Sequence, residues 1–89
     1  MMARFNTASA EMIAEGQNAS GDVLFQLGIM YATGRTVPID LVAAHKWFNL
    51  AALRGSNEAA RYRREVAEEM TAADIAAAQR DAREWLSRH

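Results

Sequence analysis

The sequence predicts an all-α protein, built as a short α-solenoid of antiparallel helix pairs with about five helices. Apolar residues recur at spacings of three and four along most of the 89-residue chain, which is the period of a helix. No segment alternates between apolar and polar residues for long enough to predict a strand. Pro38 and the glycines fall between the apolar segments, where helices end.

Two helices are predicted before Gly34. A first helix, or an N-terminal cap, is predicted over 7–16. The second is predicted from Ser20 to Thr33, because Ser20 or Asp22 can cap its start and a left-handed residue costs least at Gly34. It carries two apolar stripes, so it must contact other elements on two sides. The first stripe contains Val23, Leu27, Met30 and Tyr31, and the second contains Phe25, Ile29 and Ala32.

A linker that contains Pro38 leads to the third helix, which is predicted from Asp40 to about Arg54. Asp40 is a favourable capping residue, and Gly55 follows the end of the helix. The side chains of this helix that are expected to face the core are Leu41, Ala44, Trp47, Phe48, Ala51 and Ala52.

The last two helices are predicted over Asn57 to Met70 and Ala72 to Arg88, with a cap at Thr71 between them. Because every connection is short, consecutive helices are expected to pack as antiparallel hairpins. The residues expected to be buried are Ala59, Tyr62, Val66 and Met70 in the fourth helix, and Ile75, Ala78, Ala82, Trp85 and Leu86 in the fifth.

Composition and charge exclude several classes of function. The formal net charge is -1, so there is no basic excess to attract nucleic acid. The chain has no cysteine, which excludes disulfides and thiolate metal sites. The N-terminus lacks the pattern of a secretory signal, and no apolar run approaches the ~20 residues that span a bilayer. We therefore expect a soluble, cytoplasmic single domain over 1–89 that binds no membrane, metal or cofactor.

The stretch from Leu27 to Gly55 carries the most specific pattern. Gly28 allows an aromatic ring of the next helix to approach closely, and Tyr31 fills the space one turn later. Small residues in the third helix keep the helix pair tight. The complete set of positions is Leu27, Gly28, Tyr31, Gly34, Asp40, Ala44, Trp47, Phe48, Ala51, Ala52 and Gly55.

This pattern closely resembles the Sel-one-like repeat, a relative of the tetratricopeptide repeat. The resemblance covers one full repeat, residues 20–55, in which nearly every signature position is matched. Residues 56–89 resemble a degenerate second copy, because Arg63 and Arg64 stand where the family has Leu-Gly. Terminal repeats need a polar outer face, so 56–89 is interpreted as a C-terminal capping pair. The resemblance implies an α-solenoid whose concave face serves as a scaffold or adaptor for other proteins, without catalytic residues.

Two interpretations of the second stripe stay open. In such repeats the first helix of each pair lines the concave side, so the resemblance implies that Phe25 and Ile29 contact a partner. Gln26, Thr33 and Arg35 are then the polar neighbours that give specificity. In the alternative, the stripe packs against the N-terminal helix and belongs to the core.

The remaining candidates receive structural interpretations. Phe48 is expected in the core, whereas an exposed edge of Trp47 would be a candidate anchor for a dimer contact. His45 is predicted at the surface, without partners for a metal site. The arginines and glutamates of the fourth helix are expected to form an ion-paired outer face, with Arg61 and Glu65 at four-residue spacing.

Three classes of function follow from these patterns. The predicted function is a non-catalytic module that binds a protein or peptide on the concave helix face. The alternative is a homo-oligomerisation module such as a homodimer, since a short repeat array exposes much of its apolar edge. The third is an enzyme or accessory domain trimmed from a longer chain, for which no catalytic set of residues is visible.

Overall fold

A computed structural model describes residues 19–88, and this part of the chain is all-helical. The predicted first helix, over 7–16, lies outside the described residues. The helices within them are α2 (Gly21–Thr33), α3 (Leu41–Leu53), α4 (Asn57–Ala67) and α5 (Ala72–Arg88).

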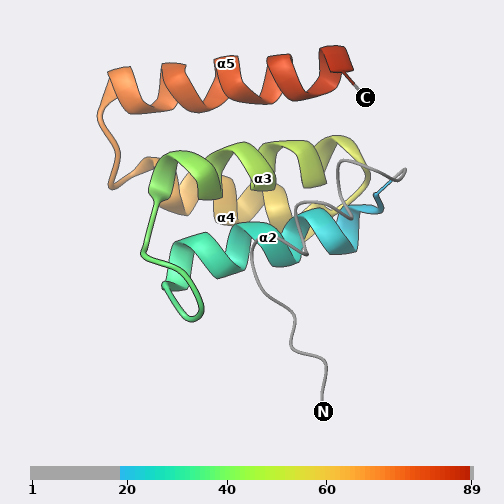
Figure 1. Ribbon diagram of the computed structural model, residues 1–89, viewed down its shortest axis with the longest axis horizontal. Coiled ribbons are helices and arrows are strands. Elements are labelled where there is room, and N and C mark those ends of the chain that lie inside the picture. Colours follow the sequence, from blue (N-terminus) through green and yellow to red (C-terminus); the bar gives the residue numbers. More distant parts are fainter. Residues whose placement is uncertain (1–18, 89) are drawn as a thin grey trace.

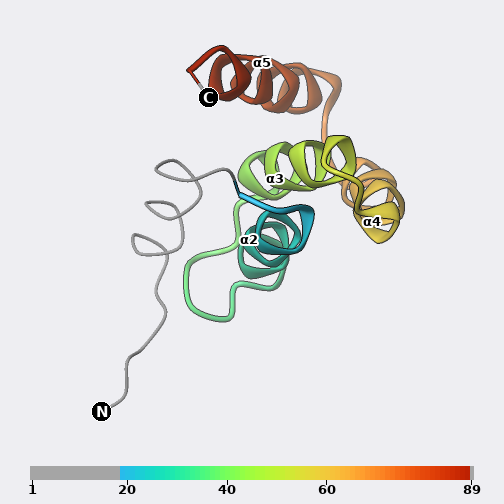
Figure 2. The same cartoon turned by 90° about the vertical axis from the view of Figure 1, so that its right-hand side faces the viewer.

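Helix α3 lies at the centre, and α2, α4 and α5 each pack against it (Figures 1 and 2). α2 and α3 form the predicted antiparallel hairpin, while α3 and α5 run in the same direction (Figure 1). The prediction that α4 and α5 pack on each other as a hairpin is wrong. The turn at 68–71 carries the chain away from α4, and the buried stripe of α5 lies against α3 instead.

Side-chain caps fix where each helix begins, and those at Ser20, Asp40 and Thr71 were predicted from the sequence. Backbone N–H groups donate to the hydroxyl of Ser20 at 3.3 Å, to a carboxylate oxygen of Asp40 at 3.1 Å and to the hydroxyl of Ser56 at 3.3 Å. The hydroxyl of Thr71 accepts from the backbone of residue 74 at 3.0 Å, which starts α5 in the same way. The predicted end of the fourth helix at Met70 is three residues too far, because the chain tightens into three-residue turns after Ala67.

Two glycines have the structural roles that their positions predict. A Cβ atom on Gly28 would overlap the ring of Phe48, so the missing side chain lets α3 lie directly on α2. Gly34 ends α2 in the left-handed conformation, with φ of 68°, and its N–H donates to the carbonyl of Met30 at 3.0 Å.

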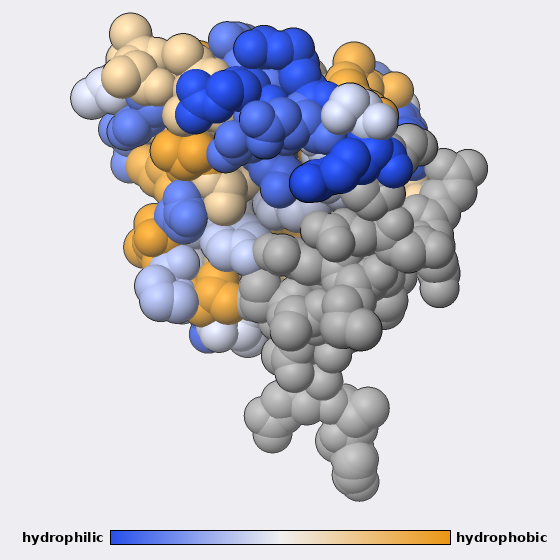
Figure 3. Space-filling view, turned by 45° about the horizontal axis from the view of Figure 1, so that its top comes forward, coloured by the Kyte–Doolittle hydropathy of each residue, from blue (hydrophilic) through white to orange (hydrophobic). Residues whose placement is uncertain are grey.

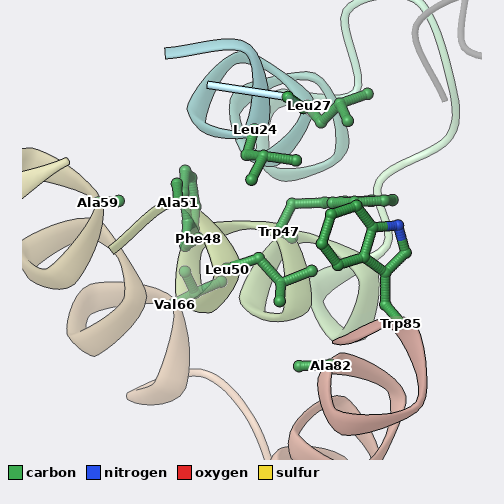
Figure 4. Packing of buried hydrophobic residues seen from close by; sticks show 12 residues of the cluster. Leu24, Leu27, Trp47, Phe48, Leu50, Ala51, Ala59, Val66, Ala82 and Trp85 are labelled. Atoms are coloured by element: carbon green, nitrogen blue, oxygen red, sulfur yellow. The ribbon is translucent and has the colours of Figure 1, made fainter. Parts of the chain in front are cut away.

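The core is a single cluster of side chains around α3 (Figure 4). The predicted core positions Ala44, Phe48 and Ala51 are fully buried. Leu24 and Leu50, which the periodicity did not assign to the core, are buried as completely. From α4 and α5 the cluster receives Ala59, Val66, Ala82 and Trp85.

One large apolar residue is in the core as predicted, and one is not. Trp47 is only 1% exposed, and the ring of Trp85 meets it edge to face at 6.0 Å, so Trp47 lacks the exposed edge that a dimer contact would require. The prediction for Leu86 is wrong, because Leu86 is 42% exposed. α5 packs mainly on α3 along the stripe of Ala78, Ala82 and Trp85, and Leu86 lies beside that stripe.

Candidate partner-binding site

Three aromatic rings hold α2, α3 and α4 together. The ring of Phe25 meets that of Tyr62 edge to face at 5.2 Å and lies 5.7 Å from that of Phe48. Phe48 and Tyr62 are 5.6 Å apart. Each helix contributes one ring, so this aromatic trio fixes how far apart α2 and α4 lie on α3.

Next to the trio, a hollow of about 170 Å³ opens between α2 and α4. We call it the α2–α4 groove. Its apolar lining comes from three helices, with Ala32 on α2, Leu41 and Phe48 on α3, and Tyr62 and Val66 on α4. The hollow is open to solvent, so it is a surface into which a side chain from outside can insert.

Two carboxylates also line the groove, Glu65 on the last turn of α4 and Glu69 in the turn that follows this helix. Glu65 accepts from Arg61 at 3.5 Å, and both side chains of this pair are more than half exposed. Such a pair holds its partners weakly. Glu69 forms no ion pair with any residue that the structure describes, so it leaves a free negative charge beside an apolar floor.

The ion-paired outer face predicted for α4 is formed only in part. Arg61 pairs with Glu65, but the guanidinium of Arg63 turns to α3 and donates to the side-chain oxygen of Asn49 at 2.7 Å. Glu68 joins Glu69 as an exposed carboxylate without an ion pair in the described part of the chain. The glutamates at this end of α4 are therefore less neutralised than the sequence suggests.

The predicted partner-binding residues fall into two groups. Phe25 and Ile29 are half-buried, with Phe25 held in the aromatic trio. Gln26, Thr33 and Arg35 are exposed, and the Thr33 hydroxyl donates to the carbonyl of Ile29 at 2.8 Å. In the alternative interpretation, this stripe packs against an N-terminal helix, and that helix lies outside the described part of the chain.

The groove residues that the sequence analysis missed come from outside α2. Leu41, Tyr62 and Val66 were assigned to the core, and the two glutamates to a solvated face. The four-residue spacing of Glu65 and Glu69 was visible in the sequence. These carboxylates line the same groove as Ala32 of α2 because α2 and α4 both pack on α3. No local sequence pattern encodes this packing.

A second hollow, of about 510 Å³, lies where the 34–40 loop meets α3 and the first turn of α5. We call it the loop hollow. It is lined by Tyr31, Pro38, Ile39, Asp40, Leu41, Val42 and Asp74. Ile39 is 62% exposed and gives this hollow an apolar side chain.

Both hollows lie at one end of the molecule, where α3 and α5 begin and α4 ends (Figure 1). Five exposed carboxylates gather there, and the neighbouring cations in the described part are Arg35 of the loop and, on α4, Arg64 and Arg61, which pairs with Glu65. We call this region the acidic end. It comprises Asp40, Glu65, Glu68, Glu69 and Asp74.

The prediction of a surface histidine is wrong. His45 is only 4% exposed, because helices pack on several sides of α3, and its Nδ1 atom has no hydrogen-bond partner among the described residues. Burial lowers the pKa of His45, and the positive charge of Arg63 lowers this pKa further. The imidazole is thus held in its neutral form inside the fold.

The described residues contain no group of three or more His, Cys, Asp or Glu side chains that could hold a metal ion. None of the described helices has the length and apolar character needed to cross a bilayer. In comparisons with known proteins, no family model, no curated protein and no solved structure matches the chain. The site's chemistry therefore has to be judged from its own geometry, which offers apolar contact and negative charge.

Proposed function

We propose that this chain is a non-catalytic helical-repeat module that binds a segment of a protein partner in the α2–α4 groove. The observation that carries the proposal is the groove itself, in which apolar side chains of three helices form a floor open to solvent. Its size suits one large apolar side chain, and concave apolar surfaces with a few polar groups are the usual binding sites of proteins. Glu65 and Glu69 supply the polar groups.

The resemblance to the Sel-one-like repeat supports this proposal through the roles of its signature residues. Gly28 receives the ring of Phe48, Gly34 ends α2 in a left-handed conformation, and Asp40 caps α3. α2 and α4 also run in the same direction, as the first helices of successive repeats would (Figure 1). In the proposal, 20–55 forms one repeat, 56–89 forms the degenerate capping pair, and the groove belongs to the concave face of a short solenoid.

A substitution on the floor of the groove tests the proposal. Peptides selected from a random library on the purified protein serve as the probe, and fluorescence anisotropy measures their affinity. Ala32→Asp puts a carboxylate on the apolar floor, where burial by a peptide leaves it unpaired. We expect the affinity to fall at least about tenfold, which corresponds to ~1.4 kcal/mol.

Ala76→Asp is the matched control, because it makes the same chemical change at an exposed position of α5. This variant should bind the selected peptides like the wild type. The proposal is wrong if a folded Ala32→Asp variant keeps full affinity, or if the library yields no peptide that binds the wild type. Circular dichroism establishes that both variants are folded.

A further inference from the structure

The acidic end and the loop hollow restrict what can cover them. The exposed Ile39 side chain stands beside the carboxylates of Asp40 and Asp74, and all three line the same hollow. One oxygen of Asp40 accepts from the N–H of Ala43, which leaves its other oxygen for a partner. A surface with an apolar centre and negative surroundings fits a partner that presents an apolar side chain flanked by cations.

The opposite end of the same chain presents this combination. Leu86 on α5 is 42% exposed and Leu53 at the end of α3 is 63% exposed. Arg83 lies one turn before Leu86 on the same face of α5. Hydrophilic side chains cover the outer face of α5 (Figure 3).

We propose that the chain associates with a second copy of itself, head to tail. Leu86 of one copy enters the loop hollow of the next, where it meets Ile39, and Arg83 lies against the carboxylate of Asp74. The hollow, at about 510 Å³, has room for a leucine side chain and the stem of the arginine. Charge complementarity orients the two copies, and the apolar contact stabilises the complex.

The two surfaces lie at opposite ends of the helices, and each copy carries one of each. Two copies related by a two-fold axis satisfy both contacts at once, whereas copies related by another operation continue into rings or open chains. The α2–α4 groove takes no part in this contact and shares only Leu41 with the loop hollow. The inference therefore stands independently of the proposed function.

Sedimentation velocity of the full chain over a range of concentrations tests the inference. At about 10 mM salt, where charges act over ~30 Å, we expect the mean mass to exceed that of a monomer and to rise with concentration. At about 1 M salt, where charges act over only ~3 Å, the association should weaken strongly. A monomer at every concentration and in low salt would overturn the inference.

Two charge reversals locate the contact. Asp74→Arg changes the loop hollow, and Arg83→Asp changes the α5 end, while Thr71 still caps α5 through the backbone of residue 74. Each variant alone should associate about tenfold more weakly, because attraction becomes repulsion. An equimolar mixture should recover the association, since each variant offers a surface that complements one on the other. Leu86→Asp, at an exposed position, should weaken association without recovery in such a mixture.

Glu84→Arg is the matched control for Asp74→Arg, because it reverses the same charge on the same helix but on another face than Leu86. It should associate like the wild type. If Asp74→Arg, Arg83→Asp and Leu86→Asp all associate like the wild type, another surface mediates the contact and the inference is wrong. It is also wrong if the two charge variants associate weakly and their mixture does too.

Discussion

The missing side chain at Gly28 is what allows the Phe48 ring to lie directly on α2. In Gly28→Ala, the new methyl group meets two carbons of a ring that is fully buried and held by two further rings. We expect a loss of about 1–3 kcal/mol in the free energy of unfolding. The overlap with the ring therefore outweighs the ~1 kcal/mol by which alanine stabilises a helix interior relative to glycine. Urea denaturation measures the difference.

The double variant Gly28→Ala/Phe48→Leu is the control for this effect. Leucine removes the ring that the methyl group meets, so Gly28→Ala should cost less in the Phe48→Leu background than in the wild type. If Gly28→Ala lowers the free energy of unfolding equally in both backgrounds, the ring of Phe48 is not the reason why glycine is needed at position 28.

His45 makes stability depend on pH. Its pKa is lowered in the fold by burial and by Arg63, so the unfolded chain binds the proton more readily. The stabilisation that comes from keeping His45 neutral is therefore fully present above the ordinary pKa of 6.5. It declines as the pH falls below this value. Thermal unfolding between about pH 7.5 and 5.5 should show a falling midpoint temperature.

His45→Gln isolates this contribution, because glutamine has a similar polarity and does not titrate. Over the same pH range its midpoint temperature should fall less than that of the wild type. An identical decline in both proteins would mean that another group is responsible and that His45 is solvated.

At the scale of elements, α5 is joined to the rest of the fold mainly through α3, on which it packs with Ala78, Ala82 and Trp85. Trp85→Ala removes the ring that meets Trp47 and should cost about 3–5 kcal/mol. We expect hydrogen exchange to show the largest loss of amide protection in α5, with smaller losses in α2. Uniform loss over all four helices would contradict a separately docked α5.

The boundaries of the helices could be predicted from the sequence because local groups determine them. Ser20, Asp40 and Thr71 accept hydrogen bonds at the starts, and Gly34 supplies the left-handed residue at the end of α2. These interactions join residues within a few positions of each other, so they leave a pattern in the sequence.

The faces of the helices were predicted less well. α2 has few polar residues, so its apolar pattern does not select a direction, and Leu24 was missed although it is fully buried. Leu50 and His45 were missed because α3 has neighbours on several sides, which one apolar stripe does not describe. Leu86 was assigned to the core together with Trp85, but it lies beside the stripe with which α5 packs on α3.

The candidate site could be predicted only in part for the same reason. The sequence analysis selected the α2 face that carries Phe25 and Ala32, and the structure places both beside α4. The contribution of α4 depends on where α3 holds it, and contacts between residues about thirty positions apart leave no periodic signal.

At the scale of the whole molecule, the buried residues of the central helix α3 should stabilise all the other described helices. Leu50 is 1% exposed, and its side chain lies in the cluster that α2, α4 and α5 share (Figure 4). Leu50→Ala should therefore cost about 2–5 kcal/mol and lower amide protection in all four described helices together. Leu53→Ala, at an exposed position of the same helix, is the control and should change stability little.

The uneven distribution of charge has a practical consequence for purification. A formal net charge of -1 predicts weak retention on any ion exchanger. The acidic end, however, can face a positively charged resin while the outer face of α5, with Arg80 and Arg83, points away from it. The protein should therefore bind an anion-exchange column more firmly than its net charge suggests. A positively charged electrode or sensor surface should bind it in the same preferred orientation.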